Sequence, residues 1–350
     1  MNKIAPLLLI LCACQVKNSD MAQSKVSGSI VYAEKFDIQD GILINYEPWP
    51  GAQFPKKYDL KEAPERIIVT STTHLTYLEM LGVDETLVGF PGTSYIYSEK
   101  INNRVVDGHI VDLGSDGQIN IELVMASQPD VVVAYDMGGE SSSLDKLIEA
   151  GIPVIYNSDF LETSALGRAE WLKFFGALFH KEAMADSIFG AISSRYQDYQ
   201  SLVEKIPNKP AVFSGVMYGD VWFLPGGNNW AAQFYQDAGA QYIWENDTTG
   251  GWLEVSFETV LDKAGKADYW VGVGTFTNLD EIVAQDERYG AFQAFQKDKV
   301  YSFSKRVGPG GGFDFFESGY ARPDIILGDL IKIFHSDLMD HDLYYYEKLK

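Results

Sequence analysis

The feature that most constrains the fold of this chain is an alternation of strand-like and helical segments, interrupted once by a long helical stretch. In the first half, short apolar and β-branched runs occur at 66–70, 86–90, 131–135 and 154–156. Continuous apolar strands that alternate with helices predict a parallel sheet covered on both faces. The alternation resumes in the second half at 211–216, 221–224, 269–273 and 300–303.

Between the two halves the apolar spacing is helical. Trp171, Phe174, Phe175 and Leu178 follow the i, i+3, i+4, i+7 pattern of an amphipathic helix. Beyond His180, roughly 26 residues run to Pro207 without a proline, enough for about 39 Å of helix. We therefore predict an α/β fold of two Rossmann-like lobes, each with a mainly parallel sheet, joined by a single long helix.

The same patterns divide the chain into segments. We expect residues 31–60 to add strands to the first lobe, without an assigned function. The predicted segments are a lipoprotein signal peptide (1–13), a polar tether (14–30), an N-terminal α/β lobe (31–160), a helical region (161–207), a C-terminal α/β lobe (208–335) and a tail (336–350).

The N-terminus predicts export and lipidation. Lys3 precedes an apolar run over 4–14, which is too short to span a bilayer and is typical of a signal peptide. The run ends at Leu11-Cys12-Ala13-Cys14, which resembles the bacterial lipobox, so Cys14 is the expected lipidation site. An ordinary secretory signal cut elsewhere is the alternative. We expect a location in the cell envelope, on the periplasmic side, anchored by lipid; no other stretch is long and apolar enough to cross a membrane.

Charge and motifs exclude several classes of function. The formal charge of −21 repels phosphate backbones, so we expect no nucleic-acid partner, although the acidity commonly reflects solubility alone. The histidines are scattered, and H-E-x-x-H, C-x-x-C and G-x-S-x-G motifs are absent from the sequence. The glycine run 308–312 lacks the Lys-Ser/Thr of a phosphate-binding loop and is interpreted as a mobile loop. We therefore predict no metal site, no cofactor and no enzymatic activity.

Large aromatic residues lie in glycine-rich loops at strand ends. In open α/β sheets, ligands bind beyond the carboxyl ends of the strands, and such sites are mostly apolar. Any one of these aromatic residues is as well explained by core packing, but together they indicate a cleft. The predicted ligand-binding residues are Thr73, His74, Tyr95, Asp136, Met137, Tyr218, Trp222, Trp230, Trp252, Phe276, Arg306 and Phe313.

The two halves of the chain share a short internal sequence similarity. The segment 120–125 (NIELVM) leads to Asp130 and a buried strand, and 256–261 (SFETVL) leads to Asp268 and another. This similarity places Glu122 and Glu258 at matching positions near the start of a predicted helix. By itself, a glutamate at the start of a helix is commonly explained by the favourable interaction of its carboxylate with the helix dipole.

The segments 65–69 (ERIIV), 120–122 (NIE), 128–133 (QPDVVV), 147–154 (LIEAGIPV), 252–258 (WLEVSFE) and 291–301 carry a resemblance. In this order around a long helix, they resemble the periplasmic binding proteins of iron-siderophore, haem and vitamin B12 ABC importers. The resemblance implies two lobes joined by a rigid helix, with limited closure and a ligand between them. It also implies that Glu122 and Glu258 pair with arginines of the permease.

The resemblance leaves the ligand open. Siderophore binders of this family commonly use cleft arginines, but the loop 114–118 has none, so Arg306 is the remaining candidate. Trp252 occupies a place where a cobalamin binder would face the corrin. We expect a ferric chelate first, with a corrinoid or haem as the alternative, bound by a monomer that docks on the permease. A chelate sensor, a chelate-insertion factor or a metal-dependent envelope enzyme on the same scaffold remain alternatives from other classes.

Overall fold

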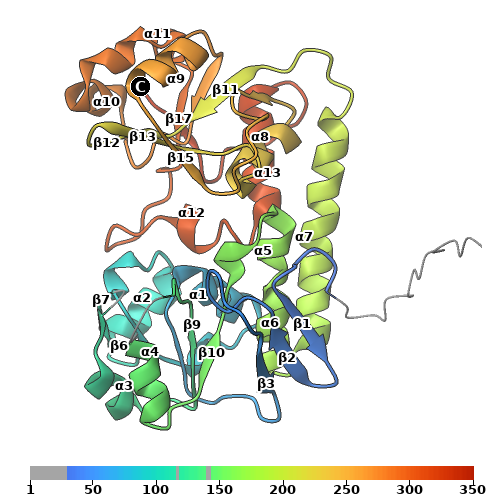
Figure 1. Ribbon diagram of the computed structural model, residues 1–350, viewed down its shortest axis with the longest axis vertical. Coiled ribbons are helices and arrows are strands. Elements are labelled where there is room, and N and C mark those ends of the chain that lie inside the picture. Colours follow the sequence, from blue (N-terminus) through green and yellow to red (C-terminus); the bar gives the residue numbers. More distant parts are fainter. Residues whose placement is uncertain (1–29, 116–117, 139–142) are drawn as a thin grey trace, which may run out of the picture.

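The computed structural model of the chain describes residues 30–115, 118–138 and 143–350. They form two lobes, one above the other, with a long helix running along one side of both (Figure 1). The first half of the chain builds the lower lobe in this view and the second half the upper lobe. The predicted signal peptide, the tether up to residue 29 and Cys14 lie outside the described residues.

The N-terminal lobe contains a five-stranded parallel sheet with the strand order β10-β9-β4-β5-β6. Its strands are β4 (Ile67–Val69), β5 (Leu87–Phe90), β6 (Val111–Asp112), β9 (Val131–Ala134) and β10 (Val154–Tyr156). Along β4, Ile67 and Val69 join one buried cluster while Ile68 joins another. Successive side chains of a strand point to opposite faces, so both faces of this sheet are covered, as continuous apolar strands predict.

Helices with polar N-caps surround this sheet. Ser71, Ser98 and Asn120 each accept a hydrogen bond from a backbone N–H of the first turn that follows. Such caps satisfy donors that the helix leaves unpaired and so fix where each helix begins. The helices of this lobe are α1 (Thr72–Met80), α2 (Glu99–Val106), α3 (Ile121–Ser127) and α4 (Ser143–Glu149). It also contains a hairpin of β7 (Gly114–Ser115) and β8 (Gln118–Ile119), and the 3₁₀ turns η1 (Asp84–Thr86), η2 (Thr93–Tyr95) and η3 (Asp159–Leu161).

Residues 36–59 add a small antiparallel sheet to the N-terminal lobe, as the sequence predicts. The strands β1 (Phe36–Gln39), β2 (Ile42–Asn45) and β3 (Lys56–Asp59) pair in that order. The Phe36 ring lies 4.4 Å from that of Trp171, and the amide of Asn45 donates to the carbonyl oxygen of Tyr156. These contacts join the added sheet both to the helical region and to β10.

The helical region crosses between the lobes. It contains α5 (Ala165–Glu170), α6 (Leu172–Leu178) and α7 (Glu182–Val203). The long helix ends four residues before Pro207, slightly earlier than the sequence predicts. It packs on α6 in the N-terminal lobe and on α13 in the C-terminal lobe, so it braces both (Figure 1).

The C-terminal lobe repeats the α/β plan. Its main sheet has the order β14-β11-β16-β17-β18, and a smaller antiparallel sheet has the order β12-β13-β15. The predicted fold class, two mainly parallel α/β lobes joined by one long helix, is therefore confirmed. The strands are β11 (Ala211–Ser214), β12 (Val216–Tyr218), β13 (Val221–Pro225), β14 (Gln241–Tyr242), β15 (Trp252–Val255), β16 (Tyr269–Val271), β17 (Val300–Ser302) and β18 (Glu347–Lys348). The helices are α8 (Trp230–Asp237), α9 (Phe257–Ala264), α10 (Leu279–Gln285), η4 (Glu287–Ala291), α11 (Gln293–Gln296), α12 (Asp314–Glu317) and α13 (Pro323–Phe334).

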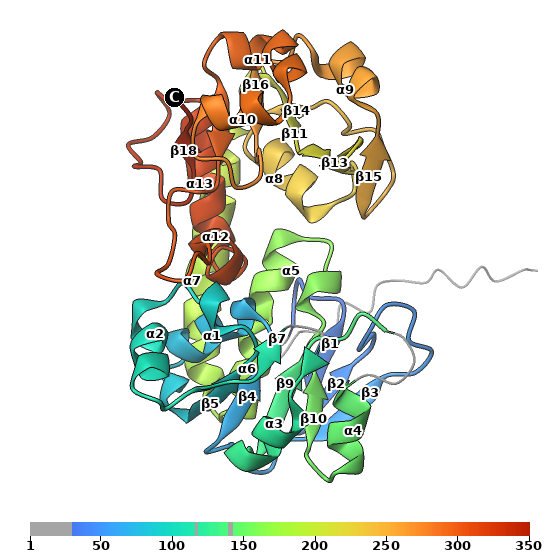
Figure 2. The ribbon, with the colours of Figure 1, turned by 90° about the vertical axis from the view of Figure 1, so that its left-hand side faces the viewer.

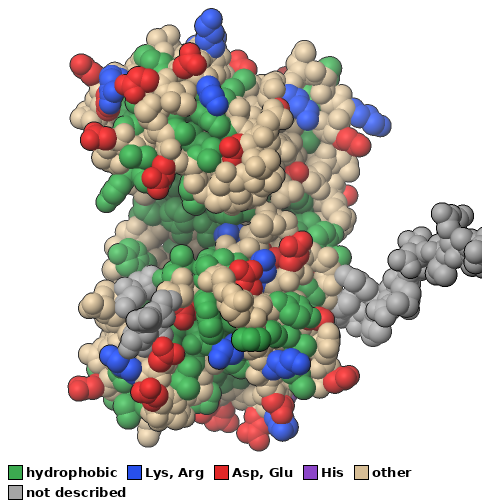
Figure 3. All heavy atoms as spheres, in the orientation of Figure 1, with side chains coloured by type: hydrophobic (Ala, Val, Ile, Leu, Met, Phe, Trp, Pro, Cys, Tyr) green, Lys and Arg blue, Asp and Glu red, His purple; other side chains and the backbone are tan. Residues whose placement is uncertain are grey.

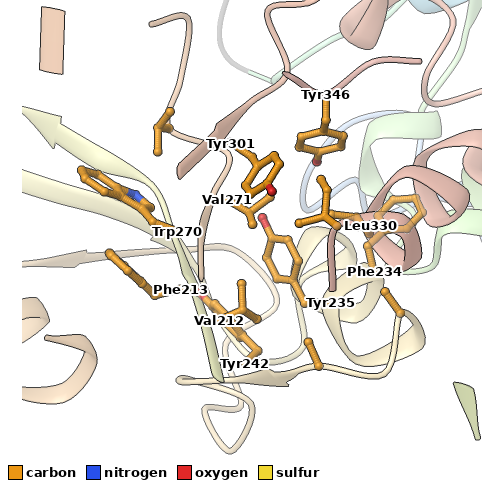
Figure 4. Close-up of a cluster of buried hydrophobic side chains, with 14 of the residues drawn as sticks. Val212, Phe213, Phe234, Tyr235, Tyr242, Trp270, Val271, Tyr301, Leu330 and Tyr346 are labelled. Atoms are coloured by element: carbon orange, nitrogen blue, oxygen red, sulfur yellow. The ribbon is translucent and has the colours of Figure 1, made fainter. Parts of the chain in front are cut away.

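The core of this lobe is rich in aromatic residues (Figure 4). The rings of Phe213 and Trp270 stack with their centroids 5.3 Å apart. Trp222, predicted as a ligand contact, packs 5.6 Å from Trp270 and is fully buried. Its indole N–H donates to the carbonyl oxygen of Ser214, so the side chain belongs to the core.

The predicted C-terminal tail is part of this lobe, so that prediction is wrong. The strand β18 pairs antiparallel with β17, and Tyr345, Tyr346 and Leu349 are buried. Both carboxylate oxygens of the buried Asp329 accept backbone N–H groups from residues 344–346, and one also contacts His341. A buried carboxylate needs such partners, and here it organises the returning segment.

Candidate ligand-binding cleft

Two cavities share a wall formed by Phe316 and Tyr320. Residues of both lobes line the first, and residues of the C-terminal lobe line the second. The first has a volume of about 600 Å³ and the second about 510 Å³. The space-filling view shows a hollow between the lobes that is lined largely by hydrophobic side chains (Figure 3). Their shared wall makes the two cavities neighbouring chambers of one cleft.

The first cavity lies at the carboxyl ends of strands from the N-terminal sheet. Residues 70–73 follow β4, Pro91 follows β5, Tyr135 follows β9 and Asp159 follows β10, and all of them line the cavity. The carboxyl ends of parallel strands meet at one edge of a sheet, which is where ligands of open α/β folds bind. The cavity therefore occupies the position that the topology favours.

The first cavity contains one buried charge pair. Asp159 accepts a hydrogen bond from the hydroxyl of Thr73 at 3.0 Å. Burial raises the pKa of Asp159, and the positive charge of Arg168 and the Thr73 bond oppose this rise. Burial likewise lowers the pKa of Arg168, and the charge of Asp159 counteracts that effect. Each charge thus stabilises the ionised form of the other.

The guanidinium of Arg168 is held in place by rings and carbonyl groups. Its central carbon lies 4.4 Å from the ring centroid of Trp230 and 5.3 Å from that of Tyr320. Its Nη2 donates to the Phe160 carbonyl oxygen at 2.6 Å, and its Nε donates to the Glu162 carbonyl oxygen. Since Trp230 belongs to the C-terminal lobe, this arginine stacks across the lobe boundary.

The second cavity is apolar and lies against the small sheet of the C-terminal lobe. Met217 and Tyr218 from β12, Phe223 from β13 and Trp252 from β15 line it together with α8. Tyr218 and Trp252 keep 82% and 56% of their surface exposed, although both are large aromatic side chains. Exposed aromatic groups around a hollow are typical of a surface that binds a ligand.

Seven of the twelve predicted ligand-binding residues line this cleft. Thr73, Tyr95, Met137 and Phe313 line the first cavity. Tyr218, Trp230 and Trp252 line the second. The structure therefore brings together residues that the sequence places far apart, and their role in binding remains a prediction.

The other five predicted residues lie outside the lining of both cavities. His74 is fully buried, its ring lies 5.5 Å from Phe175, and burial lowers its pKa to about 3. Trp222 is in the core, as described above, and Phe276 packs against the same core. Asp136 accepts the backbone N–H of Gly138 in a local turn.

Arg306, the predicted cleft arginine, is held elsewhere. Its Nε forms an ion pair with Asp314 at 2.7 Å. The guanidinium carbon also lies 4.1 Å from the ring centroid of Tyr344 and 5.2 Å from that of Tyr97. The arginine that lines the cleft is Arg168, from α5, and not Arg306.

Sequence reasoning missed several lining residues, among them Tyr135, Asp159, Arg168, Phe316 and Tyr320. Tyr135 is the last residue of one predicted strand and Asp159 follows another, so the preference for ligands at strand ends could have identified both. Arg168 lies within a helix, and its neighbours in the sequence give no sign that it faces a cavity.

A segment of the C-terminal lobe reaches across to the N-terminal lobe, and we call residues 308–317 the interlobe clasp. A Cβ atom on Gly310 would lie 2.4 Å from the carbonyl oxygen of Ser94, and one on Gly312 would lie 1.9 Å from that of Tyr95. Only glycine permits such close approach of two backbones. The glycine run is therefore a packed contact between the lobes, which its interpretation as a mobile loop did not predict.

The end of the interlobe clasp is fixed by a carboxylate. Glu317 accepts backbone N–H groups from Tyr97 at 2.6 Å and from Ser98 at 2.9 Å. The Ser98 hydroxyl donates to Glu79, and the hydroxyl of Thr76 donates to the carbonyl oxygen of Glu317. Burial raises the pKa of Glu317 to about 8, although the two N–H donors oppose the rise. Figure 1 shows α12 of the interlobe clasp between the lobes.

Glu122 and Glu258 occupy equivalent places in the two lobes. Each is the second residue of its helix, α3 or α9, and follows an N-cap residue whose side chain accepts a hydrogen bond. Both side chains are exposed, and Glu258 lies 3.3 Å from Arg288. Figure 2 shows α3 in the lower lobe and α9 in the upper lobe. Their role in docking remains a prediction.

Two other kinds of feature are absent from the described residues. Within residues 30–115, 118–138 and 143–350, no group of three or more His, Cys, Asp and Glu side chains is arranged to hold a metal ion. Over the same described part of the chain, none of the helices combines the length and apolar character needed to span a membrane.

Comparison with known families defines the class of protein. The sequence model of a family described as periplasmic binding protein matches residues 67–307. This match covers more than half of the chain, and the fold and the cleft between the lobes agree with it. The chain therefore belongs to the periplasmic binding protein family.

Individual relatives are distant. An uncharacterized lipoprotein of Methanocaldococcus jannaschii is 26% identical over 283 residues, which is 78% of this chain and 65% of that protein. The aligned region thus spans slightly less than two thirds of that relative's length.

Solved structures show the same fold. An ABC-type Fe3+-hydroxamate transport system from Saccharomonospora viridis superimposes with a TM-score of 0.61 at 21% identity, covering 83% of this chain and 98% of that one. A periplasmic haem-binding protein from Roseiflexus sp. RS-1 gives 0.62 at 16% identity, covering 79% and 99%. At these identities the likeness concerns the fold alone.

Proposed function

We propose that this protein is the substrate-binding lipoprotein of an ABC importer. In this proposal it captures an iron(III) chelate of the siderophore type between its lobes and delivers it to the permease. It binds its ligand without chemical turnover and works as a monomer. Export and lipidation at Cys14 would keep it on the periplasmic side of a membrane, near that permease.

The observation that carries the proposal is the cleft. Its first cavity lies at the carboxyl ends of the N-terminal sheet, and aromatic side chains from both lobes line the two chambers. A largely apolar cavity with a few oriented polar groups is typical of a small-molecule site. The volumes of about 600 and 510 Å³ suit a bulky chelate.

A corrinoid or haem is the second candidate, and the second cavity favours it. Tyr218 and Trp252 present exposed aromatic surface beside an apolar chamber. A flat macrocycle would cover these rings, whereas a compact ferric chelate would contact fewer of them. Burial of aromatic and macrocycle surface would supply most of the binding free energy.

Tryptophan fluorescence tests the proposal directly. The purified protein would be titrated with ferric siderophores of several classes, cyanocobalamin and haem, because Trp230 and Trp252 line the cleft. We expect tight, saturable quenching by at least one of these chelates. Free tryptophan measured at the same absorbance would correct for inner-filter losses. If none of them quenches saturably, the proposed ligand class is wrong.

A further inference from the structure

The lining of the cleft carries almost no net charge. Among the described residues that line either cavity, Asp159 and Arg168 are the only side chains with a formal charge at neutral pH. The second cavity is lined by none. One negative and one positive group therefore face a volume large enough for a chelate.

Asp159 and Arg168 already have interaction partners within the protein, including each other. Arg168 donates to two backbone carbonyl groups and lies against the rings of Trp230 and Tyr320, which also contact each other edge to face. Asp159 accepts the Thr73 hydroxyl, and its charge stabilises that of Arg168. Arg168 can offer a remaining N–H to a ligand oxygen, but its charge is not available to neutralise several anionic groups.

The arginine that the sequence predicted for the cleft adds no unpaired positive charge there. Arg306, the arginine expected there, is ion-paired with Asp314 at 2.7 Å. The whole chain has a formal charge of −21, which repels an approaching anion at long range. Transferring an uncompensated charge from water to a mostly apolar cavity is unfavourable unless the site supplies opposite charges or hydrogen bonds.

From these observations we infer that the cleft selects metal chelates of net charge near zero with a large apolar surface. A neutral ferric trihydroxamate or a corrinoid fits this description, and a trianionic ferric tris-catecholate does not. The inference rests on the proposed function, because it concerns which chelate the same cleft takes. It adds a discrimination by charge that neither the fold nor the proposed function requires.

The test compares chelates of different charge on the unmodified protein, and the trihydroxamate and the tris-catecholate in it are of similar size. A neutral ferric trihydroxamate, cyanocobalamin and a trianionic ferric tris-catecholate would be titrated by fluorescence and by calorimetry. We expect at least one neutral chelate to bind about 100-fold more tightly than the trianion, a gap that charge burial of this kind readily produces. If the trianion binds as tightly or more tightly, the charge inference fails while the proposed function stands. If neither kind of chelate binds, the proposed function fails and the inference with it.

A charge variant of the cleft provides the second measurement. Asp159→Asn removes the negative charge and keeps an oxygen that can accept the Thr73 hydroxyl. The positive charge of Arg168 would then lack its negative partner, and we expect the affinity for the trianion to rise about tenfold. The ratio of the affinity for the trianion to the affinity for the neutral chelate should therefore rise, whatever change the variant makes to both affinities in common. Asp107→Asn, at the exposed C-terminal end of α2, removes the same charge away from the cleft and should alter neither affinity. Equal changes for both chelates in Asp159→Asn would overturn the inference.

Discussion

At the scale of single residues, two tryptophans of the same small sheet differ in their environment. Trp252 in β15 is 56% exposed and lines the second cavity, whereas Trp222 in β13 is fully buried. We predict that Trp252→Ala weakens chelate binding about tenfold or more, since aromatic contacts of this kind are common binding hot spots. Its melting temperature should change little, because few core contacts are lost. An unchanged dissociation constant would remove Trp252 from the site.

Trp222→Ala is the matched comparison, and we predict the opposite outcome. Removing a fully buried tryptophan leaves a cavity beside Phe213 and Trp270, and such truncations cost about 3–5 kcal/mol of folding free energy. Chemical denaturation should show this loss directly. A stable Trp222→Ala protein with weakened binding would instead return Trp222 to the ligand site.

The same neighbourhood shows why sequence identified only part of the cleft. Glycine-rich loops and strand ends indicated Trp230 and Trp252, which do line it. In β13, however, the sequence favoured Trp222, while the adjacent Phe223 faces the cavity. Side chains alternate between the faces of a strand, so an error of one position reverses the prediction. Nothing local in the sequence tells which of the two faces meets the ligand.

At the scale of elements, the interlobe clasp has a predictable dependence on pH. Burial raises the pKa of Glu317 to about 8, while an unfolded glutamate titrates near its ordinary value of about 4.5. The folded state therefore binds more protons than the unfolded state between these values, so stability falls as pH rises through that range. The nearby Glu79, whose pKa burial also raises, adds to the same trend.

Glu317→Gln tests this prediction, because the amide stays neutral and keeps one oxygen that can accept an N–H group. We expect the melting temperature of the natural protein to fall between about pH 5 and 8 more steeply than that of the variant. Glu287→Gln, an exposed position on η4, serves as the control and should keep the natural slope. Parallel pH profiles for the natural protein and Glu317→Gln would contradict the assignment.

Elements were predictable where local patterns are strong. The β-branched runs gave β4, β9, β10 and β16 with small errors at their ends. The return of the C-terminus escaped prediction because β18 has only two residues and depends on the distant Asp329. The interlobe clasp was missed for a similar reason. Its glycines are explained by the backbone of residues 94 and 95, which is remote in the sequence.

At the scale of the whole molecule, the lobes are joined by more than the long helix. The α7 helix packs on both lobes, Arg168 stacks on Trp230, and the interlobe clasp bonds to residues 97 and 98. The two-lobe plan was predictable because the strand–helix alternation stops once and then resumes. The number of bridges could not be predicted, because each bridge joins residues that are distant in the sequence. Three bridges favour limited motion between the lobes.

Limited motion between the lobes would keep Glu122 and Glu258, the two residues predicted to dock on the permease, at a nearly constant separation. We predict that Glu122→Arg combined with Glu258→Arg abolishes chelate uptake in cells that carry the permease, while the purified double variant binds chelate normally. Both side chains are exposed at the starts of α3 and α9, outside the cleft lining. Like charges placed against permease arginines would repel, and exposed pairs chiefly govern encounter and orientation.

The control distinguishes an effect of these two positions from an effect of the total charge. Glu149→Arg combined with Asp280→Arg reverses one exposed carboxylate in each lobe, on α4 and α10, and changes the net charge equally. Uptake should survive this change. Arg288, which pairs with Glu258 at 3.3 Å, is itself exposed and bound more closely by Asp286 at 2.7 Å, so a permease arginine can displace it. Uptake that persists in the Glu122 and Glu258 double variant, or fails equally in the control, would show that these two glutamates do not define the docking surface.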